Sequence, residues 1–107
     1  MAASAPPGPK PFDAMSGDEH LDCAVYISAY TYLLAAGKVP ENREMAGQAA
    51  LALGWHHNAY AIPQGRGEQG DLINRKREEA LANDKPEAIA ERAAACISAA
   101  QAKMEAK

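Results

Sequence analysis

An apolar stretch at residues 21–36, LDCAVYISAYTYLLAA, constrains the fold of this chain more than any other feature. It holds three of the four tyrosines and one of the two cysteines, Cys23. Asp22, Ser28 and Thr31 interrupt it, and it is shorter than the roughly 18–20 apolar residues that cross a bilayer. We therefore predict a helix at the centre of a folded domain, and no transmembrane segment.

The size and composition of the chain set what this helix must pack against. At 107 residues the chain fits one small domain. Alanine supplies much of its apolar content, and alanine favours helix while filling little volume. A core of this kind needs close helix–helix contact or a covalent cross-link. We predict a single helical domain over residues 16–107, preceded by an extended proline-rich arm over residues 1–15.

Helix-terminating signals stand at both ends of the apolar stretch. Ser16 is followed three residues later by Glu19, which fits a capping box in which each side chain bonds the other's backbone. Gly37 follows the last apolar residue, where glycine takes the left-handed conformation that closes many helices. These signals predict a first helix over about residues 18–36, onto which Phe12 of the arm can pack.

Three further helices are predicted over about residues 40–61, 71–83 and 86–105. Pro40 and Pro86 stand in the first turn of a helix, where a proline is tolerated. Pro63 ends the second helix, because the residue before a proline leaves the helical region, and Asp71 caps the third. The sequence has no alternating β-branched run and no hairpin turn. Four helices with short connections indicate an all-α, up-down four-helix bundle.

Two cysteines, Cys23 and Cys96, offer a test of this topology. Cys23 lies about two turns after the start of the first helix, and Cys96 lies two to three turns before the end of the fourth. In an up-down bundle these positions fall at similar heights on antiparallel neighbours, so we predict a Cys23–Cys96 disulfide. Closing so long a loop stabilises a fold by roughly 4 kcal/mol in the chain-entropy model. Two buried free thiols are the alternative.

The amino-terminal residues bear on the compartment. MAASAPPGPKP is similar to the small residues and proline-rich spacer that often follow a signal-peptidase site. No apolar signal core is present in these residues, so this interpretation takes the signal as already removed. We expect a periplasmic or secreted protein. A cytoplasmic protein with a proline-rich tail is the alternative.

Charge and motifs argue against several classes of function. The net charge is −3 and no basic stripe exists, so nucleic acid is not an expected partner. The GxGxxG pattern at residues 65–70 follows a helix and not a strand, which favours a loop over a dinucleotide site. His56 and His57 point about 100° apart on a helix, and no HxxxH or CxxCH occurs. We expect no cofactor, no metal site and no catalytic residue; a metal- or haem-binding bundle stays open as an alternative.

The first helix has more apolar surface than a bundle helix usually buries, since about three positions in seven face the core of such a helix. Tyrosine suits an exposed apolar surface, because its ring is apolar and its tip is polar. We interpret the excess as a binding surface and assign to binding Tyr26, Tyr30, Tyr32, Trp55, His56 and Tyr60. A core helix covered by the N-terminal arm is the alternative.

A pocket between the first and second helices is a rival interpretation. His56, Tyr26 and Tyr30 would supply its polar groups, and the protein would then carry a small ligand or act on it as an enzyme. A cavity larger than a few waters at these residues would favour this rival. A tightly filled core would exclude it.

A sparse pattern over about residues 20–100 carries a family resemblance. It consists of Asp22-Cys23-Ala24, a long apolar helix, a Pro-Glu turn, a second helix rich in glycine and alanine, and a late Cys96. It resembles small two-cysteine helical proteins exported in sphingomonad-type alphaproteobacteria, an uncharacterised group. In architecture alone the chain is also similar to periplasmic acid-stress chaperones of the HdeA type, small helical proteins with one disulfide that dimerise through apolar surface. The cysteine spacing differs from theirs, and the resemblance assigns no functional residue.

We expect from these observations a small exported helical protein that works by binding and not by catalysis. Its expected partner is a second copy of itself, in a homodimer, or another protein. The expected surface is the tyrosine-rich side of the first helix together with residues 55–60. A chaperone-like role is one version of this function.

Overall fold

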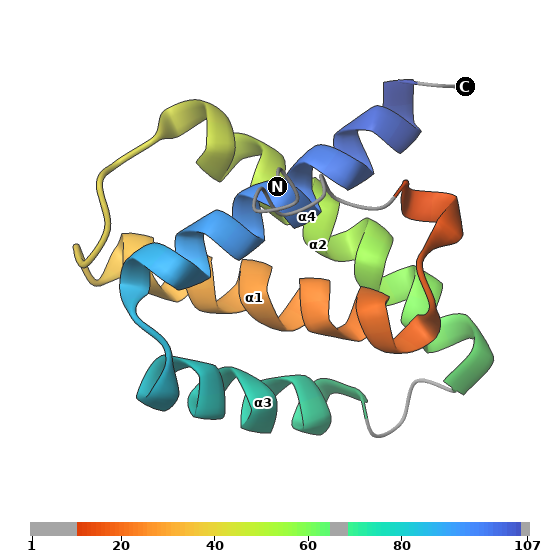
Figure 1. Ribbon diagram of the computed structural model, residues 1–107, viewed down its shortest axis with the longest axis horizontal. Coiled ribbons are helices and arrows are strands. Elements are labelled where there is room, and N and C mark those ends of the chain that lie inside the picture. Colours follow the sequence, from red (N-terminus) through yellow and green to blue (C-terminus); the bar gives the residue numbers. More distant parts are fainter. Residues whose placement is uncertain (1–10, 65–68, 106–107) are drawn as a thin grey trace, which may run out of the picture.

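The computed structural model describes residues 11–64 and 69–105 and shows a helical chain (Figure 1). A short 3-10 turn, η2 (Phe12–Ala14), precedes four α-helices: α1 (Gly17–Ala35), α2 (Arg43–Gln64), α3 (Gln69–Asn83) and α4 (Pro86–Glu105). No strand occurs in the described ranges. Consecutive helices alternate in direction, so the predicted all-α, up-down four-helix fold is confirmed.

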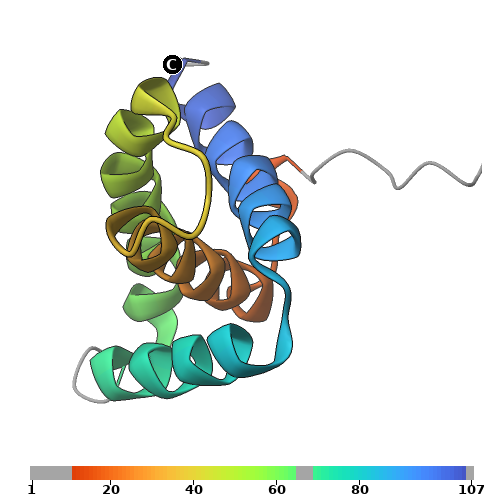
Figure 2. The same ribbon diagram turned by 90° about the vertical axis from the view of Figure 1, so that its left-hand side faces the viewer.

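The central helix of the fold is α1. It packs against α2, α3 and α4, and α2 also packs against α4. In Figure 2, α1 runs obliquely through the middle of the molecule, with α2 and α4 on either side of it and α3 beneath. Solvent reaches no part of Ala24, Ile27 or Ala29. The prediction that the chain packs around residues 21–36 is therefore confirmed.

Both ends of α1 are closed as predicted. The Glu19 N–H donates to Ser16 Oγ at 3.2 Å, and the Ser16 N–H donates to the Glu19 carboxylate at 2.8 Å, which completes the capping box. Gly37 has a φ of 73°. The Lys38 N–H donates to the Leu33 carbonyl at 2.9 Å, as in a Schellman cap. These local bonds satisfy backbone groups that the helix leaves without partners.

The second helix differs from its predicted bounds at both ends. It begins at Arg43, because Asn42 caps it: the Asn42 side-chain oxygen accepts the Met45 N–H at 3.0 Å. Pro40 therefore lies in the connection before the helix. At its other end α2 continues past the predicted end at 61, through Pro63 to Gln64. A proline in the last turn removes one hydrogen bond and leaves the preceding turns intact.

The third helix begins at Gln69, two residues before the predicted cap Asp71. Asp71 lies in the first turn instead, where its charge still favours the positive end of the helix dipole. The fourth helix begins at Pro86, as predicted. The predicted loop over residues 64–70 falls mostly on residues 65–68, which lie outside the described residues, as does most of the predicted arm.

The main core cluster combines alanines with a few larger side chains. Alanines of α1, α2 and α4 let these helices approach closely, and Ile27, Ile89 and Ile97 fill the space between them. Across the described part of the chain, no helix has both the length and the apolarity needed to cross a membrane.

A disulfide joins Cys23 of α1 to Cys96 of α4, as predicted. Their Cα atoms are 5.4 Å apart, an ordinary distance for a disulfide, and 73 residues separate them in the sequence. Cys23 is buried, and Cys96 packs against the main core cluster. The cross-link therefore holds the central helix to its antiparallel neighbour.

Candidate functional site

A pair of buried histidines lies where α1, α2 and α4 meet. His20 of α1 is 6% exposed, and His56 of α2 is 0% exposed. Their Nδ1 atoms are 2.9 Å apart, which is a hydrogen-bonding distance. The Nε2 atom of His56 lies 2.8 Å from the main-chain carbonyl oxygen of Cys96 on α4. We call His20 and His56 the histidine pair.

The hydrogen-bond partners determine where the protons of the neutral pair lie. A carbonyl oxygen only accepts, so His56 Nε2 must carry a hydrogen and donate it to Cys96. His56 Nδ1 is then an acceptor in the neutral ring. His20 must therefore donate from Nδ1 to His56 Nδ1. The neutral pair is a directed chain of hydrogen bonds from α1 through α2 to α4.

Phe12 covers both imidazole rings. Its ring centroid is 4.5 Å from that of His20 and 5.0 Å from that of His56. It also meets the ring of Trp55 edge-on at 5.8 Å. Lys103 of α4 and Asp13 of η2 form an exposed ion pair at 2.8 Å beside this cluster. The turn η2 is thus held by aromatic packing and by one surface charge contact.

Burial lowers the pKa of both histidines from the ordinary value of 6.5. For His20, desolvation outweighs the Phe12 carbonyl and the charges of Glu19 and Asp13, which favour a protonated ring. For His56, desolvation outweighs the Cys96 carbonyl, and the neighbouring His20 lowers the pKa further. The pair is therefore neutral at neutral pH, and its burial brings no unpaired charge into the core.

Apolar side chains of α2 reach solvent away from its buried side. Leu51 is 59% exposed and Trp55 is 37% exposed. They border a hollow of about 500 Å³. We call the surface around this hollow the α2 face; it is formed by Phe12, Ala50, Leu51, Gly54, Trp55, Asn58 and Ala59.

The α2 face has the composition of a protein interface. From residue 45 to residue 64 the sequence contains no Asp, Glu, Lys or Arg. Interface cores are depleted of charged residues and enriched in aromatic ones. A Cβ built on Gly54 would meet no atom within 4 Å, so packing inside the chain does not require glycine there. Glycine nonetheless costs about 1 kcal/mol in a helix relative to alanine.

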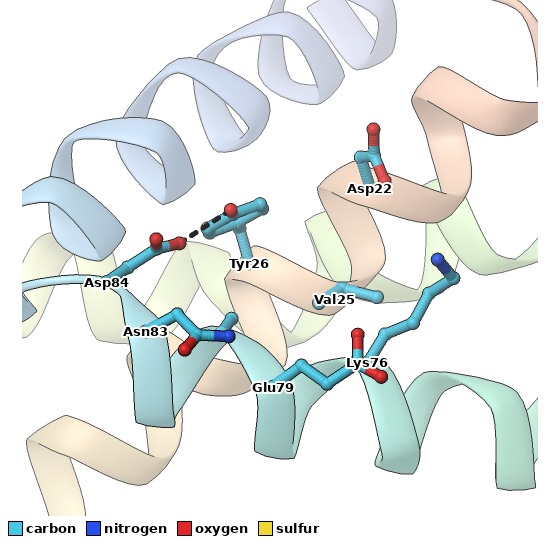
Figure 3. A pocket seen from close by; sticks show the side chains of 8 residues that line it. Asp22, Val25, Tyr26, Lys76, Glu79, Asn83 and Asp84 are labelled. Carbon is cyan, nitrogen blue, oxygen red and sulfur yellow. Dashed lines mark hydrogen bonds between the residues drawn. The ribbon is translucent and has the colours of Figure 1, made fainter.

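A second hollow, of about 230 Å³, is polar and lies between α1 and α3 (Figure 3). Tyr26 donates its phenol hydrogen to the Asp84 carboxylate at 2.7 Å, and the Arg92 guanidinium lies 4.3 Å from the centroid of the same ring. The hydrogen bond to Asp84 is the main reason that the pKa of Tyr26 is raised above 10.0. The phenol thus stays protonated and links α1 to the end of α3. It is not tuned to exchange a proton near neutral pH.

The residues assigned to binding from the sequence do not lie together on one surface. Three of them are buried: Tyr30, His56 and Tyr60. Tyr26 is occupied by its bond to Asp84. Tyr32 is 53% exposed on α1, and Trp55 is exposed on α2. The excess apolar surface of α1 is mostly covered, because three other helices pack on it.

The rival pocket between α1 and α2 is not formed by the three residues assigned to it. His56 is enclosed and hydrogen-bonded on both ring nitrogens, and Tyr30 is buried in the main core cluster. Tyr26 does line a hollow, but that hollow lies between α1 and α3. The side chains between α1 and α2 are packed at these positions.

Two side chains of the site, His20 and Phe12, were not assigned to any site from the sequence. A signal for His20 was present: it precedes Cys23 by three residues and so lies on the same side of α1. Once Cys23 is joined to Cys96, His20 must lie near α4. For the α2 face, the signal was the charge-free run from residue 45 to residue 64.

Within residues 11–64 and 69–105, no three or more His, Cys, Asp or Glu side chains gather in a way that would hold a metal ion. No family model, no curated protein and no solved structure matches this chain. Function therefore has to be argued from the two features described above, the histidine pair and the α2 face.

Proposed function

We propose that this protein is a small exported binding protein and that the α2 face is its binding surface, with a second copy of the chain as its partner. One observation carries the proposal: exposed Leu51 and Trp55 border a hollow on a helix that has no charged residue from 45 to 64. Large exposed apolar patches on a small protein usually mark an interaction surface.

The charge distribution permits a second copy as the partner, provided that the contact is made through an uncharged face. Each chain has a net charge of −3, so two chains repel each other on average. Contact through the α2 face brings together two surfaces without charged side chains and avoids that repulsion locally. Most homodimers use the same patch on both subunits, and such a patch must be complementary to itself.

The shape of the α2 face supplies this complementarity. Leu51 and Trp55 protrude, while Ala50, Gly54 and Ala59 leave space beside them. In a two-fold arrangement, the protruding side chains of one copy enter the hollow of the other. Burying a large apolar side chain contributes roughly 1.5–3 kcal/mol, and each copy contributes two. The open backbone at Gly54 lets the second helix approach closely.

The disulfide and the resemblance support an extracytoplasmic location. Disulfides persist in oxidising compartments such as the periplasm, and Cys23–Cys96 is the kind of cross-link that stabilises small exported domains. A chaperone-like role is the version of this function in which the α2 face also binds apolar segments of other proteins.

Light scattering coupled to size-exclusion chromatography tests the proposal on the full oxidised chain. The expected mass is twice 11.3 kDa at high concentration, falling towards 11.3 kDa on dilution. Leu51→Glu should give a monomer, because it places a charge in each half of the interface. Tyr32→Glu is the matched control, since it adds the same charge at an exposed position of α1.

The control also separates the two surfaces considered for binding. If Tyr32→Glu abolishes the dimer and Leu51→Glu does not, the binding surface lies on α1 and the proposal is wrong. A wild-type chain that stays at 11.3 kDa at millimolar concentration also contradicts it.

A further inference from the structure

We propose that the histidine pair is a proton-operated latch: it holds the turn η2 against α1, α2 and α4, and it releases η2 when both rings are protonated. The geometry of one bond carries this inference. His20 Nδ1 and His56 Nδ1 face each other at 2.9 Å, and only one hydrogen fits between them.

The first added proton can be accommodated without breaking a bond. It goes to His20 Nε2, and the Nδ1–H of His20 still donates to His56 Nδ1. The Phe12 carbonyl acts on His20 as a hydrogen-bond acceptor and favours this charged ring. His56 keeps its bond to the Cys96 carbonyl throughout.

A second proton cannot be added without breaking the hydrogen bond between the two rings. It must go to His56 Nδ1, which then presents an N–H to the N–H of His20, and the bond between the rings is lost. Two positive rings would also lie side by side with centroids 5.1 Å apart, in a site that solvent barely reaches. Both effects drive the rings apart or bring water between them.

The charged groups around the histidine pair act differently on the two imidazole rings. Asp13 of η2 and Glu19 of α1 favour a charge on His20. On α4, Lys103 forms an ion pair with Asp13. On α2, His57 follows His56 directly and is partly exposed. The carboxylates of Asp13 and Glu19 favour the first proton on His20. Neither of them is among the groups that shift the pKa of His56.

The element displaced on opening is η2. It has three residues, and Phe12 is the side chain that covers both imidazoles. The other described side-chain contact of η2 is the exposed ion pair between Asp13 and Lys103. Exposed ion pairs contribute little to stability. Lifting η2 lets water reach the charged rings while the disulfide still holds α1 to α4.

Release of η2 would also change the α2 face, because Phe12 forms one edge of its hollow. This consequence rests on the proposed function, whereas the latch itself does not. The two are separable: the latch is measured at a dilution where light scattering reports a single chain.

Trp55 provides the readout, because it is the one tryptophan of the chain and Phe12 meets its ring. Its emission is followed from pH 7.5 to pH 4.5 on the full oxidised chain, together with circular dichroism. We expect a cooperative change in emission below pH 6.5 while the helical signal is retained. His20→Gln should remove this change, and His57→Gln, the matched control, should keep it.

Nitrogen NMR of the imidazole rings gives a second readout that needs no variant. At pH 7.5 we expect the hydrogen of His56 on Nε2 and that of His20 on Nδ1. The latch is refuted if His20 carries its hydrogen on Nε2 at that pH, if His57→Gln removes the emission change, or if emission changes only when the helices unfold. If His20→Gln does not fold, the ring nitrogens of the wild-type chain decide the question.

Discussion

The helices α1 and α2 differ in a way that their apolar content does not reveal. The more apolar helix is α1, yet three other helices and the turn η2 surround it, so little of its apolar surface reaches solvent. The helix α2 is less apolar, and it leaves Leu51 and Trp55 exposed on its outer side. On its inner side it buries His56 completely.

The comparison shows that the number of neighbours of a helix, and not its hydrophobicity, determines which apolar residues are available for binding. A central helix covers its own apolar surface by packing. A peripheral helix has one side without an intramolecular neighbour, and the residues on that side report what else the protein contacts. If this is correct, substitutions in α1 should act on stability and substitutions on the α2 face should act on association.

The largest expected effect comes from the cross-link of the central helix. Replacing both Cys23 and Cys96 by serine should lower the free energy of unfolding by roughly 4 kcal/mol, because the unfolded chain regains the entropy of a 73-residue separation. Chemical denaturation of the variant and the wild type measures this difference. An unchanged midpoint would mean that α1 is held by its packing alone.

A pair of single substitutions compares the two helices directly. Ile27→Ala should cost roughly 2–5 kcal/mol, because Ile27 is fully buried in α1 and leaves a cavity. Leu51→Ala should change the stability of the monomer by less than about 0.5 kcal/mol, because its side chain is exposed on α2. Denaturation at low protein concentration gives both values. Equal costs would contradict the contrast between the two helices.

Acid should destabilise the inner side of α2 through the histidine pair. Both pKa values are lower in the folded chain than 6.5, so the unfolded chain binds protons first as the pH falls. Stability is therefore greatest above pH 6.5 and decreases below it until the folded histidines titrate. The slope is at most about 1.4 kcal/mol per pH unit for each histidine. His20→Gln should reduce this slope, because it removes one of the two shifted groups. A slope equal to that of the wild type would contradict this assignment.

The smallest effect should separate folding from binding on the outer side of α2. Gly54→Ala should raise the stability of the monomer by about 1 kcal/mol, because alanine favours helix and its methyl group meets no other part of the fold within 4 Å. The same methyl group should weaken the dimer, because it enters the hollow of the α2 face. Gly47→Ala is the control: it offers the same gain in helix and lies outside the hollow. Weakening by both variants alike would place the contact elsewhere.

Much of the fold could be predicted because its signals are local. The capping box at Ser16, the glycine at 37 and Pro86 each mark a helix end within a few residues. The pairing of Cys23 with Cys96 followed from helix order and length alone. The start of α2 was missed because Asn42 was not recognised as a competing cap for that helix.

The candidate site was harder to predict because it depends on contacts between distant segments. His20 and His56 meet only after α1 and α2 have packed at one particular rotation, and Phe12 reaches them from the preceding turn. The tyrosines of α1 were assigned to a surface because this helix has more apolar positions than a bundle helix usually buries. Most of that excess is covered instead, because three other helices pack on α1. The count of its neighbours is a property of the tertiary fold.

The central claim is that the α2 face is the surface on which this protein associates. Two-dimensional amide NMR over a dilution series tests it residue by residue. We expect concentration-dependent shifts at residues 50–59 and at Phe12, and none around Tyr32 of α1. Shifts centred on Tyr32, or a spectrum that does not change with concentration, would contradict the claim.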